Sequence, residues 1–299
     1  MTTELQGKRI GITGVSGMVG QALAERLRNN GAEVIGFSRT PKEGQRSWAK
    51  PTEADYSGLD GLVHLAGESV LGRWTPAKKQ RILSSRVEGT RGVVEGLGRL
   101  APEERPAVLV SASAIGIYGE RGDAVLPEYA APGDGFLADV TTQWEAEAQQ
   151  AADLGIRVMM PRIGVVLGPS GGAARIWKLV FGLGMGGKLG DGKQWVSWIG
   201  LDDLVSILED GLIYDVLQGP VNAASPNPMR NADLSQVIGE VMRRPSLIPA
   251  PAFGMRFLMG EMAAVMLQSQ RVEPAILRQA GFQWKTPKLR AALEDAFRS

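Results

Sequence analysis

The feature that most constrains the fold is a run of three glycines, Gly14, Gly17 and Gly20, spaced three residues apart. It follows a short apolar segment, 9–13, that is typical of a strand, and it opens a segment, 18–30, with helical periodicity. In this context the first glycine permits a tight turn, the second lets the backbone approach a pyrophosphate, and the third lets helix pack on strand. The N–H groups at the helix start then bind the anion. The run predicts a dinucleotide site, and the alternative is a plain strand–turn–helix.

A regular alternation of strand-like and helical segments follows the glycine run. Strands separated by helices of about 12 residues or more form right-handed crossovers and a parallel sheet covered on both faces. The predicted strands are 9–13, 33–37, 61–66, 107–112 and 156–160, and the predicted helices are 18–30, 75–100 and 136–154.

Beyond residue 165 the alternation loosens into a glycine- and tryptophan-rich stretch and a mostly helical tail. We therefore expect an α/β fold of the Rossmann type, with a doubly wound parallel sheet. Its dinucleotide-binding domain would span 1–165, with sheet elements returning near 195–224. Residues 166–299 would form a smaller, mostly helical substrate lobe, in which 253–267 is predicted to be one buried or partner-facing helix.

The composition removes several classes of function. There are 33 Lys and Arg against 32 Asp and Glu, a formal charge of +1, so no global field attracts nucleic acid or an anionic membrane. Cysteine is absent and His64 is the one histidine, which argues against metal sites and a Ser-His-Asp triad. No apolar run reaches about 18 residues, and no signal peptide is evident. We expect a cytoplasmic protein without metal, nucleic-acid or membrane partners.

The end of the second predicted strand bears on the choice of cofactor. NAD-binding proteins usually place Asp or Glu there, to bond the ribose 2′-hydroxyl. Here the chain reads GFSRT, and Ser38 and Arg39 occupy the position. A guanidinium could form a charge-assisted contact with a 2′-phosphate, whereas the alternative is a solvated loop arginine. The pattern favours NADP(H) over NAD.

Several motifs resemble those of the extended short-chain dehydrogenases/reductases, the NAD-dependent epimerase/dehydratase group. These motifs are TGVSGMVG, LVHLAG, SASAIGIYG, PRIGVVLG and SWIGLDDLV. More narrowly, RWTPAKKQRILSSRVEGT, GFLADVTTQWE, GGKLGDGKQWVSW and the tail are similar to uncharacterised epimerase-family proteins of the SDR39U1 type, which have their own C-terminal domain. The likeness covers nearly the whole chain. It implies NADP(H) binding and indicates no substrate.

The strand ends and the resemblance together suggest which residues meet the cofactor. Arg162 would lie beside the nicotinamide, and Ser113 matches the catalytic serine that polarises a carbonyl in this superfamily. Many relatives pair through helices on the flank of the sheet, so a homodimer is a further expectation. The expected cofactor residues are Gly14, Ser16, Gly17, Met18, Val19, Gly20, Ser38, Arg39, Leu65, Ala66, Gly67, Glu68, Arg86, Ser111, Ala112, Pro161, Arg162 and Ile163.

The Tyr-x-x-x-Lys pair of the superfamily is missing. There the tyrosine transfers the proton and the lysine lowers its pKa, because a tyrosine with a pKa of about 10 is a poor base at neutral pH. None of the four tyrosines has a lysine four residues later. The helix expected to carry the pair offers Phe136 and Val140, and Gly200 stands where relatives more often have histidine.

Two other residues could take part in catalysis. Glu68 follows the third central strand, where partial desolvation would raise its pKa and let it act as acid or base; a capping role is the alternative. Tyr118 could swing towards Ser113 and donate a proton, or it could be a packed tyrosine with a bonded hydroxyl.

Other side chains could form a substrate pocket. Arg73 could clamp an anionic group with Trp74 as its apolar wall. Trp195 could line the same pocket, although large aromatic residues are more often core. His64 lies inside an apolar strand and is expected to be buried and hydrogen-bonded.

Two functions fit this pattern. The first is an NADP(H)-dependent oxidoreductase or nucleotide-sugar-epimerase-like enzyme with an atypical acid–base group. The second is a non-catalytic NADP(H)-binding regulatory or interaction protein, with cell division as one setting. The retained Ser113 favours the enzyme and the missing pair favours the alternative; we prefer the enzyme.

Overall fold

A parallel β-sheet forms the centre of the molecule and carries the strand ends of the candidate site. The computed structural model describes residues 3–169 and 171–298. The main sheet has the strand order β12-β8-β5-β4-β1-β2-β3 with all pairings parallel, which confirms the expected doubly wound Rossmann type. The strands are β1 (Arg9–Thr13), β2 (Glu33–Ser38), β3 (Gln45–Ser47), β4 (Gly61–His64), β5 (Val108–Ser111), β6 (Ser113–Ala114, paired with β8), β8 (Arg157–Ile163) and β12 (Gly219–Ala223).

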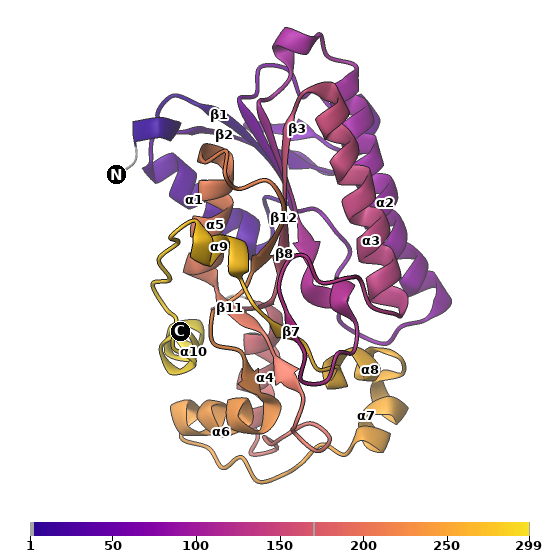
Figure 1. Cartoon of the computed structure of the whole chain (residues 1–299), viewed down its shortest axis with the longest axis vertical. Helices are drawn as coiled ribbons and strands as arrows, with labels where there is room; N and C mark the ends of the chain where they lie inside the picture. The colour runs from indigo at the N-terminus through magenta and orange to yellow at the C-terminus, as the bar shows by residue number, and fades with distance from the viewer. Residues whose placement is uncertain (1–2, 170, 299) are drawn as a thin grey trace.

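Two pairs of helices cover the two faces of this sheet (Figure 1). On one face α1 (Met18–Asn29) packs against α5 (Leu201–Ile213), and on the other α2 (Pro76–Gly98) packs against α3 (Phe136–Gln149). Because neither face meets water, the strands bury apolar side chains on both sides. Those near α1 and α5 include Ile10, Ile12, Val63 and Val110, and those near α2 and α3 include Leu62, Leu109, Val158 and Met160.

Local sequence signals set where two of these helices begin and end. Thr75 caps α2, with its Oγ1 accepting a hydrogen bond from the Lys78 N–H at 3.2 Å. Pro76 takes the first helical position, where no N–H is needed. α3 continues as a 3-10 turn (Gln150–Leu154) and stops at Gly155, whose φ of 80° favours glycine. The predicted start and stop are therefore confirmed.

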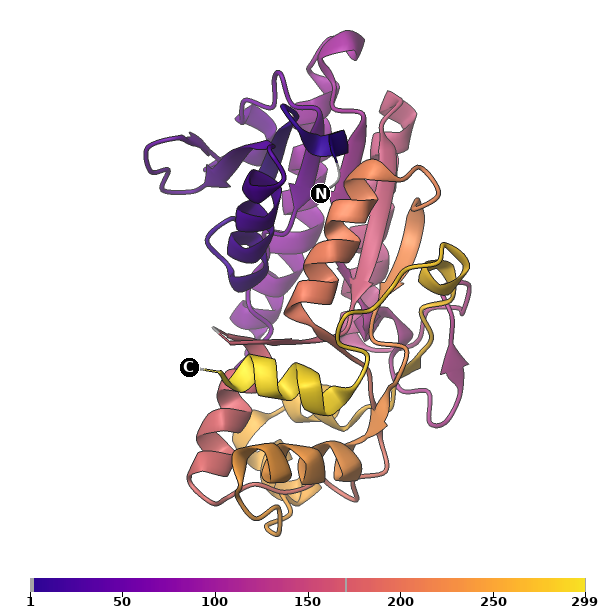
Figure 2. The ribbon, with the colours of Figure 1, turned by 90° about the vertical axis from the view of Figure 1, so that its left-hand side faces the viewer.

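A smaller lobe, built mostly from the C-terminal half of the chain, lies beyond the strand ends. It has its own apolar core, and Figure 2 shows α10 lying between α5 and α6. Its helices are α4 (Gly172–Gly182), α6 (Asn231–Met242), α7 (Ala252–Met259), α8 (Met262–Leu267), α9 (Ala275–Gln279) and α10 (Leu289–Phe297). Short strands pair β9 (Val165–Gly168) with β11 (Trp198–Gly200), β10 (Trp195–Val196) with β13 (Met229–Arg230), and β7 (Val125–Leu126) with β14 (Arg271–Val272).

The prediction of one continuous helix over 253–267 is wrong. Gly260, with φ of 62°, separates α7 from α8, and glycine adopts this conformation without a Cβ clash. Phe253 and Phe257 of α7 are exposed, whereas Met262 of α8 is buried. Neither of these helices, nor any other in the described part of the chain, is long and apolar enough to cross a membrane.

Candidate functional site

The turn between β1 and α1 has the geometry that the glycine run predicts. Gly14 adopts φ of 71°, and a Cβ on Gly20 would lie 2.3 Å from the Gly14 carbonyl oxygen. Gly17 precedes α1 and donates its N–H to the same oxygen at 3.0 Å. Among the described residues, no acceptor bonds the Met18 or Val19 N–H. Open N–H groups at a helix start bind anions such as a pyrophosphate.

The exit of β2 presents an exposed cation. Ser38 bonds the backbone of Thr40 through its hydroxyl, in a local turn. Arg39 is exposed, and no hydrogen bond or ion pair within residues 3–169 and 171–298 engages its guanidinium. Its charge is therefore open to a 2′-phosphate.

His64 is fixed beneath the exit of β4. Its Nδ1 lies 2.7 Å from Thr13 Oγ1, and its Nε2 lies 3.1 Å from Thr90 Oγ1. Thr13 Oγ1 also accepts the Leu65 N–H at 3.1 Å. Burial lowers the pKa of His64 to about 4. The neutral ring thus joins β1, β4 and α2 below the loop, as expected of a buried, bonded histidine.

We expect this histidine to make the fold less stable as the pH falls from 6.5 to about 4. An unfolded histidine takes up a proton near 6.5 and folded His64 only near 4, so the unfolded state binds more protons in that window. The stabilisation is complete above 6.5, and its loss amounts to about 3 kcal/mol. As the one histidine, His64 gives an unambiguous imidazole NMR titration. A midpoint near 6.5 in the folded protein would contradict the assignment, and His64→Gln should lack this part of the pH slope.

The expectation that Glu68 has a raised pKa is wrong. Its carboxylate accepts a hydrogen bond from Lys78 Nζ at 2.6 Å and lies 3.7 Å from Arg81 Nε. The Lys78 bond holds the pKa of Glu68 below its ordinary value, and the charges of Lys78 and Arg81 act in the same direction. Glu68 is therefore ionised, and it anchors the start of α2 through Lys78.

Three neighbouring strands place Ser113, Arg162 and Asn222 in one row. In the register of the sheet, Ser113 of β6 pairs with Arg162 of β8, and Arg162 pairs with Asn222 of β12. Because side chains alternate along a strand, paired positions of neighbouring parallel strands point to the same face. All three side chains are buried.

A carboxylate from α3 completes this row. Glu145 accepts hydrogen bonds from Arg162 Nε and Nη2, each at 2.8 Å, and from Ser113 Oγ at 2.5 Å. The side chains of the Arg162–Glu145 pair are only 6% and 11% exposed. Sequence reasoning missed Glu145. Its signal was an acidic residue on the buried stripe of α3, with Ala138, Thr141 and Ala148.

Tyr118 does not reach Ser113 as the sequence suggested. The tyrosine is fully buried, and its hydroxyl donates to Asn222 Oδ1 at 2.7 Å and accepts from Arg162 Nη1 at 2.9 Å. Burial raises the pKa of Tyr118. The alternative of a packed tyrosine with a bonded hydroxyl is the correct one.

The α3 positions that could replace the Tyr-Lys pair carry no proton-transfer group. Phe136 packs edge-on against Trp74, with ring centroids 5.2 Å apart, and Val140 is buried. Trp74 is itself mostly core, since it is 8% exposed and its Nε1 donates to a backbone carbonyl. Arg73 beside it is exposed. Trp74 and Phe136 line a small pocket of about 260 Å³, and Arg73 is not one of its lining residues.

Trp195 contacts two arginines. The guanidinium carbons of Arg230 and Arg271 lie 4.3 Å and 4.7 Å from the centroid of its ring. Asp123 accepts from the indole Nε1 at 2.9 Å and pairs with Arg230 at 2.6 Å. Arg271 has no carboxylate partner among the ion pairs of the described residues, so its charge is available to an anionic ligand.

The residues at the exits of β1, β4 and β5 fit a dinucleotide. Ser111 Oγ is buried and has no hydrogen-bond partner in the described chain, although buried polar groups are generally bonded. The Gly67 backbone is exposed after β4. With the open N–H groups of α1, these features line the edge where dinucleotides lie in doubly wound sheets.

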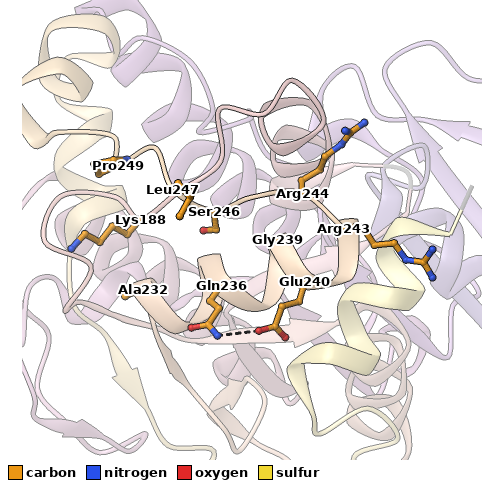
Figure 3. A pocket seen from close by; sticks show the side chains of 10 residues that line it. All are labelled: Lys188, Ala232, Gln236, Gly239, Glu240, Arg243, Arg244, Ser246, Leu247 and Pro249. Carbon is orange, nitrogen blue, oxygen red and sulfur yellow. Dashed lines mark hydrogen bonds between the residues drawn. The ribbon is translucent and has the colours of Figure 1, made fainter.

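A pocket of about 680 Å³ lies in the smaller lobe, away from these strand ends (Figure 3). It is lined by residues of α6, by the segment 243–249 and by Lys188. The charged ends of Lys188, Arg243 and Arg244 point away from one another. Diverging cations do not clamp a single anion, so we do not assign this pocket to the site.

Comparison with known proteins decides the family. Residues 10–209 match the NAD dependent epimerase/dehydratase family. The chain belongs to this family. Residues 250–296 match a domain of unknown function, DUF1731, so the resemblance read from the motifs is confirmed, including the separate C-terminal domain.

Three relatives place the chain within the epimerase/dehydratase family. An Arabidopsis thaliana protein described as an epimerase family protein SDR39U1 homolog, chloroplastic, is 35% identical over 296 residues, which cover 95% of this chain and 85% of that protein. The crystal structure of human SDR39U1 with NADPH matches with a TM-score of 0.90 and 32% identity over 97% of this chain and 99% of that chain. A nucleoside-diphosphate sugar epimerase from Corynebacterium glutamicum matches with a TM-score of 0.80 and 35% identity, over 98% of this chain and 58% of that chain.

Proposed function

We propose that the protein is an NADP(H)-dependent oxidoreductase or epimerase-like enzyme in which Ser113, backed by Glu145, handles the proton. The observation that carries this proposal is the 2.5 Å hydrogen bond between a serine at the family's catalytic position and a buried carboxylate. Buried ionisable groups are costly to fold around and cluster at functional sites. The chain has this arrangement and has no Tyr-x-x-x-Lys pair.

Two observations support NADP(H) as the cofactor. Human SDR39U1, which covers nearly the same length, was crystallised with NADPH. In this chain the exposed Arg39, and no carboxylate, stands at the exit of β2. When bound, the nicotinamide would supply or accept hydride, and the chain would supply orientation and the proton.

The hydrogen bond to Glu145 determines what Ser113 offers a substrate. Because the hydroxyl proton points at the carboxylate, Ser113 Oγ presents only lone pairs outward. It would accept the proton of a substrate hydroxyl while its own proton moves to Glu145, and the reverse transfer would serve carbonyl reduction. Arg162, with two bonds to Glu145, holds the carboxylate in position for both directions.

One arginine of the smaller lobe supports an anionic substrate. Gln270 Nε2 donates to the Gly119 carbonyl at 3.1 Å, which places β14 and Arg271 beside the segment that carries Tyr118. Arg271, lying over Trp195, is suited to a phosphate or carboxylate. The Corynebacterium relative points to the same chemistry, so we propose a nucleoside-diphosphate sugar as the substrate class.

The alternative is an NADP(H)-binding regulatory protein without turnover. The apolar Phe136 and Val140 at the helix positions expected for the missing pair favour it. In that case the cofactor would serve as a structural or redox-sensing ligand.

Ser113→Ala should lower NADPH-dependent reduction of keto-sugar nucleotides by about 100-fold or more, because it removes the group that exchanges the proton. NADPH affinity should stay within about threefold, since no phosphate contact is lost. The measurement is the loss of reduced-nicotinamide absorbance across a panel of keto-sugar nucleotides and simple ketones. Tyr118→Phe is the matched control and should retain most of the rate. A wild-type protein that binds NADPH tightly and reduces none of the panel would favour the regulatory alternative.

A further inference from the structure

The far end of the smaller lobe exposes a group of large apolar side chains. Phe253 and Phe257 lie one turn apart on the same side of α7, and they are 78% and 84% exposed. Leu247, in the segment before this helix, is exposed to a similar extent. The other exposed members of the group are Leu183, Met185 and Ile248. These six residues are called the lobe-end surface below.

The backbone holds the parts of the lobe-end surface next to one another. The Ile248 N–H donates to the Gly186 carbonyl oxygen at 3.1 Å, and the Ala250 N–H donates to the Lys188 carbonyl oxygen at 2.9 Å. The two segments therefore run side by side, and α7 begins two residues after Ala250. Figure 1 shows α7 and the loop between α6 and α7 at the lower end of the molecule, away from the sheet. The six side chains thus belong to one region of the surface.

The size of the lobe-end surface fits a stable contact with another molecule. From their exposed fractions, the six side chains present about 700 Å² to solvent. The largest apolar patch on an ordinary monomer measures about 300–600 Å². A standard protein interface takes about 800 Å² from each partner. The exposed apolar area is therefore larger than a monomer normally shows and close to what one side of an interface needs.

The helices on the flank of the sheet offer no comparable surface. α2 and α3, which the structure describes in full, expose no large apolar side chain. The core of a stable interface is apolar and poor in charge, so the lobe end is better suited to pairing than this flank. The exposed positions of the two helices are mostly polar, namely Gln80, Arg81, Glu88, Arg91 and Glu95 on α2, and Asp139, Thr142, Gln143 and Gln149 on α3.

A hollow adjoins the lobe-end surface. Leu247 is one of the residues that line the pocket of about 680 Å³ shown in Figure 3. In a twofold pair each copy contributes the same patch, so a protruding side chain of one copy enters a hollow of the other. An apolar protrusion beside a pocket therefore suits a second copy of this chain.

The charges around the pocket are of both signs. Lys188 and Arg244 line it, Asp191 is three residues from Lys188, and Asp233 follows a lining residue of α6. None of these four takes part in an ion pair within residues 3–169 and 171–298. Two facing copies place such cations and carboxylates opposite one another, whereas an anionic membrane would repel the two carboxylates.

We propose that two copies of the chain pair through the lobe-end surface, with the α7 phenylalanines of one copy entering the pocket beside Leu247 of the other. α7 is the first helix of residues 250–296, the part that matches DUF1731, so pairing gives this domain a role. The lobe-end surface lies away from Ser113 and the strand ends. The inference is therefore independent of the proposed function.

Sedimentation equilibrium of the full-length protein tests the pairing. Wild type should be a dimer at about 100 µM, as expected for an interface of standard size. Phe253→Ser/Phe257→Ser should raise the dissociation constant of the dimer by about 100-fold or more, because a few buried aromatic residues carry most of the binding energy of an interface. Leu247→Glu, which leaves α7 unchanged, should weaken the dimer similarly and serves if the double variant folds poorly.

Tyr129→Ser is the matched control, because Tyr129 is an exposed aromatic residue outside the lobe-end surface. It should leave the dissociation constant unchanged. A wild type that stays monomeric at about 100 µM overturns the inference. A dimer that persists in both variants also overturns it, since its interface then lies elsewhere. Binding of a monomeric wild type to vesicles that contain phosphatidylglycerol would show that a lipid surface covers these residues, and this too overturns the inference.

Discussion

Replacing Arg162 by methionine should lower the free energy of unfolding by about 3–5 kcal/mol, because it leaves the Glu145 carboxylate buried without its charge partner. Glu145→Leu should lower the free energy of unfolding by a similar amount, since it leaves the buried Arg162 guanidinium without a carboxylate partner. The double variant Arg162→Met/Glu145→Leu should recover most of the loss, because apolar groups of similar size often replace buried ion pairs at little cost. Urea unfolding of the four proteins measures the coupling.

The Arg91–Glu147 pair provides the matched control. It joins α2 to α3, whereas the Arg162–Glu145 pair joins β8 to α3, and the side chain of Arg91 is 50% exposed. Arg91→Met should cost less than about 1 kcal/mol. If Arg162→Met costs no more than Arg91→Met, the Arg162–Glu145 pair does not stabilise the fold as the geometry indicates.

Gly20→Ala should weaken NADPH binding by about a hundredfold and lower the free energy of unfolding by about 1–3 kcal/mol. The new Cβ would lie 2.3 Å from the Gly14 carbonyl oxygen and 2.9 Å from Val15 Cα, and both are backbone atoms. The start of α1 would have to move away from the turn, which separates the N–H groups that bind the pyrophosphate.

Gly182→Ala is the control for this substitution, because no atom lies within 4 Å of the Cβ it would add. It should leave NADPH affinity unchanged within about twofold. Calorimetry measures the binding constants and urea unfolding the stability. Wild-type affinity in Gly20→Ala would show that the dinucleotide does not lie on this turn.

The expectations that succeeded rest on local interactions. The glycine turn, the Thr75–Pro76 helix start and the stop at Gly155 each depend on the conformation of a few consecutive residues. The alternation of strands and helices restricts topology just as strongly, since parallel strands require crossover helices. These features could be predicted because the residues that cause them are neighbours in the sequence.

The expectations that failed depended on residues distant in the sequence. Glu68 follows β4 at the edge of the sheet that the sequence predicts, but its pKa is lowered by Lys78, which lies ten residues later in the first turn of α2. Tyr118 could not be judged without Asn222, which lies 104 residues later and accepts its hydroxyl proton. Glu145 was overlooked because a carboxylate on a helix is ordinarily solvent-facing.

The sequence by itself determined the Rossmann-type sheet, the dinucleotide turn and the absence of a Tyr-Lys pair, because glycine conformation, helical periodicity and residue spacing are properties of short segments. Only the tertiary structure decided which side chains meet at the strand ends. The register of β6, β8 and β12 sets Ser113, Arg162 and Asn222 side by side, and the packing of α3 brings Glu145 onto them. Charges and hydrogen bonds act through space, so their partners are known only once the chain has folded.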